Sequence, residues 1–335
     1  MNLQFKNKIL DLSSPAVMGI LNVTPDSFYD GGNYFSLSLG GRAGEGALLS
    51  HVEKMVFEGA DIVDIGACST RPNAKEVSEE EELKRLIPAI QLVRKKFADV
   101  IISADTFRSK VAEEAVNAGA DMINDVSGGS GFMFYGLQST VYGSTANQPE
   151  TGNPVGNNSN GVNRKPETKM FETIAKLNVP YVLMHIQGTP QTMQKNPHYK
   201  DVVKEVKEYF KEKIGILEGW KDGRLIIDVG FGFGKTLEHN YTLLKHLAQF
   251  KEFGLPILAG LSRKSMISNA TDPSPSLPKG ERNARSSPPP SGGRGANGTT
   301  AANTIALMNG ANILRVHDVK EAKEAVKIVN CMRAS

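Results

Sequence analysis

The side chains best able to do chemistry in this chain stand at the ends of short apolar runs rich in valine and isoleucine. They include carboxylates, amides, imidazoles and cations, which can hold a polar ligand or move a proton. A single polar residue at such a position more often caps a helix or forms a turn. Seven of the runs carry one, however, and a set of that size indicates a shared functional site. Its members are Asn22, Asp105, Asn124, His185, Asp228, the Ser262-Arg263-Lys264 triplet, Arg315 and His317.

Two kinds of ligand chemistry fit this set. Asp105, Asn124 and Asp228 offer acceptors and an amide to a flat heterocycle with adjacent N–H groups. A carboxylate makes two parallel hydrogen bonds with an aminopyrimidine edge, and such bonds are strong where water is excluded. Asn22, Arg315 and His317 suit an anion instead, because an arginine fork matches phosphate oxygens. One half of the site therefore suits a ring and the other half a phosphate group.

The apolar runs that position these residues are predicted to be buried strands, and amphipathic helical patterns follow nearly all of them. Eight alternating βα units favour the α/β class and a single closed parallel (βα)8 TIM barrel, in which chemistry sits at the carboxyl ends of the strands. A doubly wound open sheet is the alternative. The predicted strands are Val17–Asn22, Asp61–Ile65, Val100–Asp105, Asp121–Asn124, Pro180–His185, Arg224–Val229, Pro256–Gly260 and Asn312–Val316.

A short motif recurs between predicted helices and strands. It reads Gly59-Ala60-Asp61, Gly119-Ala120-Asp121 and Gly310-Ala311-Asn312. Glycine suits the left-handed residue that ends a helix, so the motif supports the count of βα units.

Composition bounds the class of protein. Hydrophobic residues make up 40% of the 335, the formal net charge is +3, and there are two cysteines. No stretch of 18 apolar residues predicts a membrane span, and the amino terminus lacks the apolar segment of a secretory signal. We therefore expect a soluble cytoplasmic α/β protein that binds neither nucleic acid nor membranes.

Residues 1–335 are predicted to form one domain with two insertions. The first, 131–167, carries six asparagines and six glycines, and 15 of the 27 residues of the second, 271–297, are proline, serine or glycine. Neither segment has enough apolar surface to order itself, so both are expected to be flexible loops.

A glycine-rich stretch, Gly230–Thr236, is similar to a phosphate-binding loop. Such a loop has four residues between the first glycine and its Gly-Lys pair, whereas this stretch has three. A nucleotide hydrolase is therefore not expected.

Taken in order, the motifs resemble those of the dihydropteroate synthase family from about residue 16 to residue 330. They are Val17–Phe28, Asp64-Ile-Gly, Ser69-Thr-Arg-Pro72, Ser103–Phe107, Ile123–Ser127, Leu183-Met-His185, Asp228–Lys235, Gly260–Lys264, Gly298-Thr-Thr-Ala301 and Leu314–Asp318. Each motif is short, but their joint order is specific.

The resemblance implies a transferase that joins 6-hydroxymethyl-7,8-dihydropterin diphosphate to p-aminobenzoate, with Mg²⁺ as cofactor. It releases pyrophosphate early, which leaves a pterin cation for the amine to attack. Sulfonamides inhibit this family, and its members usually form homodimers through their last helices.

The resemblance also assigns roles to individual residues. Lys264, Asp105 and Arg315 would be the catalytic side chains, and Asn22 would contact the metal. The pterin would contact Asp105, Asn124, Met184, Asp228 and Lys264. The diphosphate would contact Asn22, Arg315 and His317. The aminobenzoate would contact Thr70, Arg71, Pro72, Phe233 and Ser265.

Other interpretations stay open. Asp228 could cap a helix that begins near Thr236, and Lys264 could be a surface lysine. Tyr29 and the pair Ala67-Cys68 depart from the family pattern, which puts the early loops in doubt. A non-catalytic pterin-binding paralogue and a folate-dependent methyltransferase are the rival functions.

Overall fold

Eight parallel strands close into a barrel in the order of the chain, and the last strand pairs with the first, at Ile313 and Ala16. The computed structural model describes residues 1–24, 42–70, 77–130, 166–217, 223–271 and 296–335. The strands are β3 (Ala16–Asn22), β4 (Ile62–Gly66), β5 (Ile101–Asp105), β6 (Met122–Asp125), β7 (Tyr181–Met184), β8 (Leu225–Asp228), β9 (Ile257–Ala259) and β10 (Ile313–Val316). Each strand end lies within one residue of its prediction. The predicted barrel is confirmed, and its closure excludes the open sheet.

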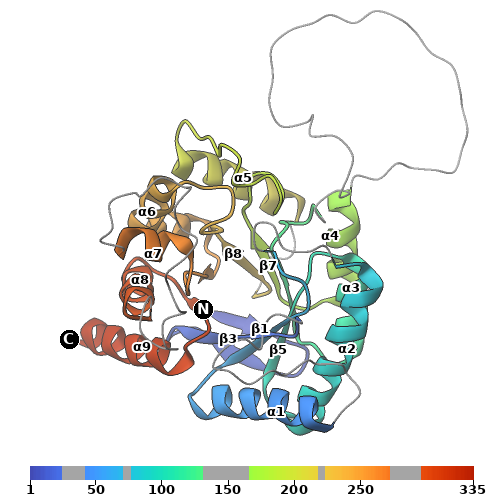
Figure 1. Ribbon diagram of the computed structural model, residues 1–335. Helices are drawn as coiled ribbons and strands as arrows, with labels where there is room; N and C mark the ends of the chain where they lie inside the picture. The colour runs from blue at the N-terminus through green and yellow to red at the C-terminus, as the bar shows by residue number, and fades with distance from the viewer. Residues whose placement is uncertain (25–41, 71–76, 131–165, 218–222, 272–295) are drawn as a thin grey trace, which may run out of the picture.

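Helices form an outer ring around the strands (Figure 1). They are α1 (Arg42–Phe57), α2 (Glu79–Lys96), α3 (Ser109–Asn117), α4 (Pro166–Leu177), α5 (Val202–Ile216), α6 (Leu237–Lys245), the 3-10 helix η1 (Leu247–Phe253), α7 (Ser265–Thr271), α8 (Ala296–Met308) and α9 (Val319–Ala334). The bulk of both predicted insertions lies outside the described residues. At the edges of these segments, residues 166–167 begin α4, 271 ends α7 and 296–297 begin α8.

Local hydrogen bonds begin several of these helices. The Ser78 side chain accepts from the Glu81 amide at the start of α2, and the Asp201 side chain accepts from two amides at the start of α5. Thr236 caps α6, where its hydroxyl accepts from the His239 amide at 3.2 Å. Side-chain oxygens at these positions satisfy amides that have no partner within the helix. Because Thr236 caps α6 by itself, the capping role considered for Asp228 is already filled.

The recurring Gly-Ala-Asp/Asn motif joins neighbouring strands at the amino end of the barrel. Its glycines have φ of +95°, +116° and +99°, which only glycine adopts readily. Its third residues, Asp61, Asp121 and Asn312, accept from strand amides at 2.7, 2.8 and 3.0 Å. The backbone amide of each third residue also donates to the carbonyl of that same strand residue, which is Val17, Ile102 or Ile257. The repeated sequence motif therefore makes the same pair of hydrogen bonds at three places, each of which joins the start of one strand to the strand before it.

A hairpin that the sequence did not predict covers the amino end of the barrel. It pairs β1 (Asn2–Gln4) with β2 (Ile9–Asp11), and β1 lies near the centre of the ring in Figure 1. Leu3 of the hairpin and the nearby Phe5 and Leu12 form one apolar cluster with side chains from all eight barrel strands. Strand β3 contributes two of these side chains and each of the other strands contributes one. Those partners are Ala16, Met18, Ile62, Ile101, Met122, Val182, Ile226, Leu258 and Ile313. We call this apolar layer the floor.

A second apolar cluster lies between the strands and the helices. It contains the alternate strand residues, among them Val17, Val63 and Ile102, packed against the inner faces of the helices. Alternation along each strand therefore sends one set of side chains into the barrel and the other set outward. Within the described residues, no helix combines the length and the apolar character needed to cross a bilayer.

Candidate active site

The polar residues named from the sequence gather above the floor because strand side chains alternate. Two residues beyond floor positions such as Ile62, Ile226 and Ile313, the same inward face carries Asp64, Asp228 and Arg315. We call this carboxyl end of the barrel the mouth. Asn22, Ser103, Asp105, Asn124 and Gly260 occupy inward positions there by the same parity.

Arg315 stands at the centre of a charged cluster in the mouth. Its Nε donates to Asp64 Oδ2 at 2.6 Å, and its Nη2 donates to Asp105 Oδ2 at 2.6 Å. Asn124 Nδ2 donates to the same Asp64 oxygen at 3.1 Å. Arg315, which the sequence assigned to the diphosphate, is thus linked to two residues assigned to the pterin. It bonds Asp105 directly, and it shares the Asp64 oxygen with Asn124.

Asp64 is the residue of this cluster to which the sequence assigned no role. It is completely buried, and its Oδ1 has no hydrogen-bond partner among the described residues. The hydroxyl of Ser103, its partner in register on β5, also has none. Buried polar atoms are normally hydrogen-bonded. Asp64 Oδ1 and the Ser103 hydroxyl are therefore available to bind a polar ligand in the mouth.

Burial raises the pKa of Asp105 to about 7, although the Arg315 charge opposes that rise. A carboxyl with a raised pKa favours the folded state while it is protonated, so its contribution to stability is lost as pH rises from about 4 through 7. We expect Asp105→Asn to flatten this part of the pH dependence of the free energy of unfolding. Urea denaturation of both proteins at pH 5, 6, 7 and 8 measures it. Because burial also raises the pKa of Glu82, Asp125 and Asp228, only the difference between the two proteins tests Asp105. Parallel profiles would contradict the assignment.

Asp228 and Lys264 form a second charged group in the mouth. Asp228 Oδ1 accepts from the Gly230 amide at 2.8 Å, and Lys264 Nζ donates to the Phe231 carbonyl. The two groups approach across Gly260, where a Cβ would lie 3.9 Å from both Asp228 Oδ2 and Lys264 Nζ. Burial raises the pKa of Asp228 and lowers the pKa of Lys264 to about 8, while the attraction between the two charges opposes both shifts.

An apolar shelf lies beside these charges. It is made by Phe107, Val126 and Met184, with Cys68, Ile186 and Phe233 packed against them. The ring of Phe233 also lies 4.7 Å from Lys264 Nζ, a cation–π distance. A flat ring held by the mouth carboxylates would find an apolar surface here. Burial raises the pKa of the Cys68 thiol to about 11, so this departure from the family pattern does not supply a reactive thiolate.

The remaining assigned residues lie around the rim, with two exceptions. His317 Nδ1 lies 3.0 Å from Ser262 Oγ, which fixes the orientation of its ring. Thr70 is half-buried after β4, Ser265 is exposed at the first residue of α7, and Asn22 is half-buried at the end of β3. Arg71 and Pro72 lie outside the described residues, as does Tyr29.

His185 does not join the mouth. Because Met184 faces inward, the next residue along β7 points outward, and the His185 ring lies 4.8 Å from that of Tyr209 on α5. Burial, followed by the Lys235 charge, lowers its pKa well below the usual value. Its place in the predicted shared site was therefore wrong.

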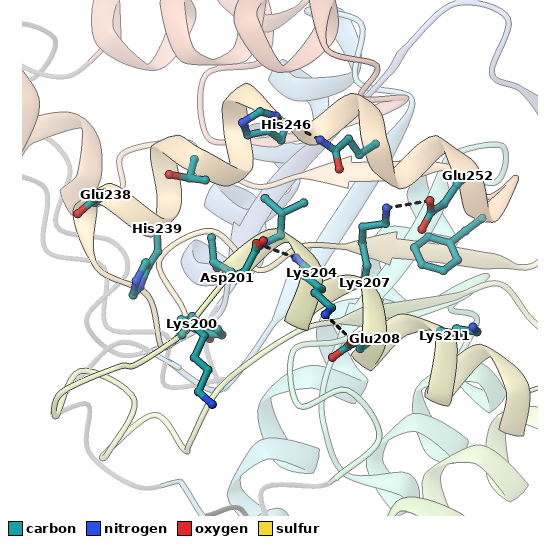
Figure 2. A pocket seen from close by; sticks show the side chains of 16 residues that line it. Lys200, Asp201, Lys204, Lys207, Glu208, Lys211, Glu238, His239, His246 and Glu252 are labelled. Atoms are coloured by element: carbon teal, nitrogen blue, oxygen red, sulfur yellow. Dashed lines mark hydrogen bonds and ion pairs between the residues drawn. The ribbon is translucent and has the colours of Figure 1, made fainter.

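A groove of about 880 Å³ lies on the outside of the barrel, between α5 and the α6–η1 segment (Figure 2). Lysines and glutamates line it together, and Lys207 pairs with Glu252 at 2.8 Å. Its charges largely cancel, and none of the mouth residues lines it. We therefore place the chemistry in the mouth rather than in this outer groove.

Comparison with known proteins agrees with the geometry of the mouth. The family described as pterin binding enzyme matches residues 18–146 and 150–317, which include every inward polar residue described above. The fold and the site therefore define a pterin-binding barrel enzyme.

Individual relatives narrow the class. The dihydropteroate synthase of Haemophilus influenzae is 41% identical over 330 residues, which cover 98% of each chain. The structure of Yersinia pestis dihydropteroate synthase with a sulfonamide drug matches with a TM-score of 0.75 and 38% identity over 100% of both chains. That of Xanthomonas albilineans dihydropteroate synthase with 4-aminobenzoic acid has a TM-score of 0.72 and 36% identity over 99% of this chain and 98% of the other. The chain belongs to the dihydropteroate synthase family, a family of transferases, as its motifs indicated.

Proposed function

We propose that the chain condenses 6-hydroxymethyl-7,8-dihydropterin diphosphate with p-aminobenzoate to give 7,8-dihydropteroate and pyrophosphate. The observation that carries the proposal is the mouth itself, where Asp64, Asp105, Asn124 and Asp228 converge beside an apolar shelf and two cations. Carboxylates bind the N–H edge of an aminopyrimidine, and the shelf faces its ring. Relatives solved with a sulfonamide and with 4-aminobenzoic acid support an aminobenzoate site and inhibition by sulfonamides.

The mechanism follows from the weak nucleophilicity of an aromatic amine. The C–O bond to the diphosphate breaks first, and both bonding electrons leave with pyrophosphate. The pterin methylene cation that remains is stabilised by the ring and by the negative charge of Asp105. Arg315 then lies between the cation site and the leaving group, and its Nη1 bonds neither Asp64 nor Asp105. That free edge of the guanidinium, with His317, would hold the diphosphate and stabilise its growing charge. The amine attacks the methylene carbon and loses a proton.

Mg²⁺ fits the donor chemistry of the rim. Asn22 carries an amide oxygen at the end of β3, and its side chain makes no hydrogen bond among the described residues. Mg²⁺ prefers oxygen ligands and commonly takes one or two from the protein and the rest from water and phosphate. Asn22 would therefore hold the ion together with the diphosphate, where its charge would stabilise the leaving group.

Pyrophosphate release tests the proposal directly. The pterin diphosphate is incubated with Mg²⁺, with and without p-aminobenzoate, and both pyrophosphate and dihydropteroate are measured. Release that depends on p-aminobenzoate and yields dihydropteroate supports the synthase. Tight pterin binding without release would identify a non-catalytic pterin-binding protein, and no pterin binding would overturn the assignment of the site.

We also propose that two copies associate through α8 and α9, which pack against each other. Together they expose four large apolar side chains: Ile305 (47%), Met308 (49%), Ile328 (67%) and Met332 (49%). Large apolar side chains exposed on two helices that pack together are typical of a protein–protein contact. The free state of both cysteines, Cys68 and Cys331, supports a cytoplasmic location for the assembly.

Ile328→Glu with Met332→Glu is expected to convert the dimer to monomers, because two carboxylates would be buried unpaired in the contact. Light scattering after size-exclusion chromatography measures the mass. Ile216→Glu is the matched control, since Ile216 is 54% exposed at the end of α5, and α6 and α7 stand between α5 and α8 in the ring of helices (Figure 1). A double variant that stays dimeric would place the contact elsewhere.

A further inference from the structure

Lys235 lies inside the loop that joins β8 to α6, where its side chain is only 3% exposed. Its Nζ donates to the carbonyl oxygens of Gly230 and Phe233 at 3.0 and 2.9 Å, and it lies 2.9 Å from His185 Nδ1. A phosphate-binding lysine points out of its loop toward the ligand. This lysine does the opposite: its amine is at the centre of the loop and satisfies the carbonyls that converge on it.

The glycines of the loop allow this shape. Gly230, Gly232 and Gly234 have φ of +68°, +82° and +62°. A Cβ at Gly230 or Gly234 would collide with the carbonyl oxygen of His185 or of Gln187. The loop therefore packs closely on the residues that follow β7, and the Lys235 amine fastens the two segments together through His185.

The outer side of the same loop faces the mouth. Phe231 offers its carbonyl to Lys264 Nζ, and the Phe233 ring lies 4.7 Å from that amine and against the apolar shelf. Phe233 donates no side-chain hydrogen bond that could fix its position, so its backbone must do so. The Phe233 carbonyl is one of the three carbonyl oxygens that accept from Lys235 Nζ, with those of Gly230 and His185.

We infer that Lys235 is a positioning residue for the amine substrate: it touches no substrate, but it fixes the 230–234 loop so that Phe233 forms one wall of the aminobenzoate pocket. The inference rests on the proposed placement of p-aminobenzoate beside Phe233. A positioning role of this kind affects one substrate more than the other, because the pterin contacts Asp105, Asn124 and Met184 lie on other strands. The loop reaches the pterin side only through the Gly230 amide on Asp228 and the Phe231 carbonyl on Lys264, neither of which accepts from Lys235.

Lys235→Met keeps most of the side-chain volume and removes the amine. We expect the KM for p-aminobenzoate to rise about tenfold or more, since a displacement of about 1 Å in a binding wall has effects of that order. The KM for the pterin diphosphate should change less than about threefold by the same argument. Steady-state kinetics with each substrate varied in turn measure the split.

Lys213→Met is the matched control, because Lys213 is equally buried at 3% but lies on α5, near the Tyr209 ring. It should lower the thermal midpoint without separating the two KM values. The inference is wrong if Lys235→Met raises both KM values equally or raises neither. If Phe233→Ala nevertheless raises the KM for p-aminobenzoate, the proposed placement of that substrate stands. If Phe233→Ala has no effect either, the placement is wrong and the inference falls with it.

A second pair of variants serves if Lys235→Met does not fold. His185→Phe removes the ring nitrogen that faces the amine, whereas His185→Asn offers an amide oxygen in its place. We expect the first to raise the KM for p-aminobenzoate selectively and the second to restore it in large part. Equal kinetics for the two variants would overturn the proposed link through His185.

Discussion

Replacing Lys264 with alanine is expected to lower kcat/KM for dihydropteroate synthesis by about 10³-fold, and Asp228→Ala by a similar factor. The two side chains lie on either side of Gly260 in the mouth and attract each other. Losing one buried charged contact with a ligand costs about 2–5 kcal/mol. About 1.4 kcal/mol corresponds to each tenfold. The loss falls on the reaction because the pterin would meet an incomplete set of charges.

The fold is expected to survive both changes. In Lys264→Ala the carboxyl of Asp228, whose pKa burial already raises, can take up a proton instead of remaining a buried charge. Cooperative urea unfolding with an unchanged m value checks this point. Near-full activity in either variant would show that the pterin lies elsewhere.

Lys264→Arg refines the test because arginine keeps its charge at high pH. Burial lowers the pKa of Lys264 to about 8, so kcat/KM of the natural protein should decline as pH rises through 8. If the ammonium is the form that binds the pterin, the arginine variant loses activity through its shape but shows no decline near pH 8. A decline that persists unchanged would assign that ionisation to another group.

Arg315→Met is the second change with a large expected effect, and it separates stability from activity. The guanidinium is the shared partner of Asp64 and Asp105, so its loss leaves two carboxylates facing each other inside the barrel. We expect the free energy of unfolding to fall by about 3–5 kcal/mol at pH 8 and synthesis to become undetectable. Denaturant unfolding and pyrophosphate release measure the two effects independently.

The pH dependence identifies the cause of the instability. Asp105 already has a pKa of about 7 with Arg315 present, and that pKa must rise further without it. Its protonation relieves the repulsion, so the variant should lose less stability at pH 5.5 than at pH 8. Adding Asp105→Asn to Arg315→Met should recover part of the stability at pH 8 without restoring synthesis. An equal loss at both pH values would mean that packing, not charge, is responsible.

The strands and most of the mouth could be predicted from the sequence because a buried parallel strand leaves a plain pattern. Each strand of the barrel is a short run made mostly of apolar residues, and several of them, such as Ile101–Asp105, end in a polar one. One polar residue near the end of such a run has an ordinary structural explanation, but the same feature in seven runs does not, which is why Asp105, Asp228 and Arg315 could be singled out together.

What escaped prediction depends on contacts between distant parts of the chain. Asp64 lies in the middle of β4 rather than at its end, and only the barrel register shows that it faces Arg315. His185 was placed in the mouth because it follows a strand, although the parity of β7 turns it outward. Lys235 was considered only as part of a phosphate-loop pattern. Its actual role comes from the fold of the loop around it, which glycine spacing alone does not specify.

The hairpin that covers the floor has a consequence for how the chain folds during synthesis. Its side chains Leu3, Phe5 and Leu12 leave the ribosome before the barrel strands do, yet the surface that buries them includes Leu258 of β9 and Ile313 of β10. The apolar side chains of the hairpin must therefore wait until β10 has been made before the surface that buries them is complete. Contacts of such large sequence separation form slowly and leave apolar surface exposed in the meantime. Nascent chains that stall before β10 should consequently present an unpaired hairpin and an open barrel to chaperones, whereas the finished protein presents neither.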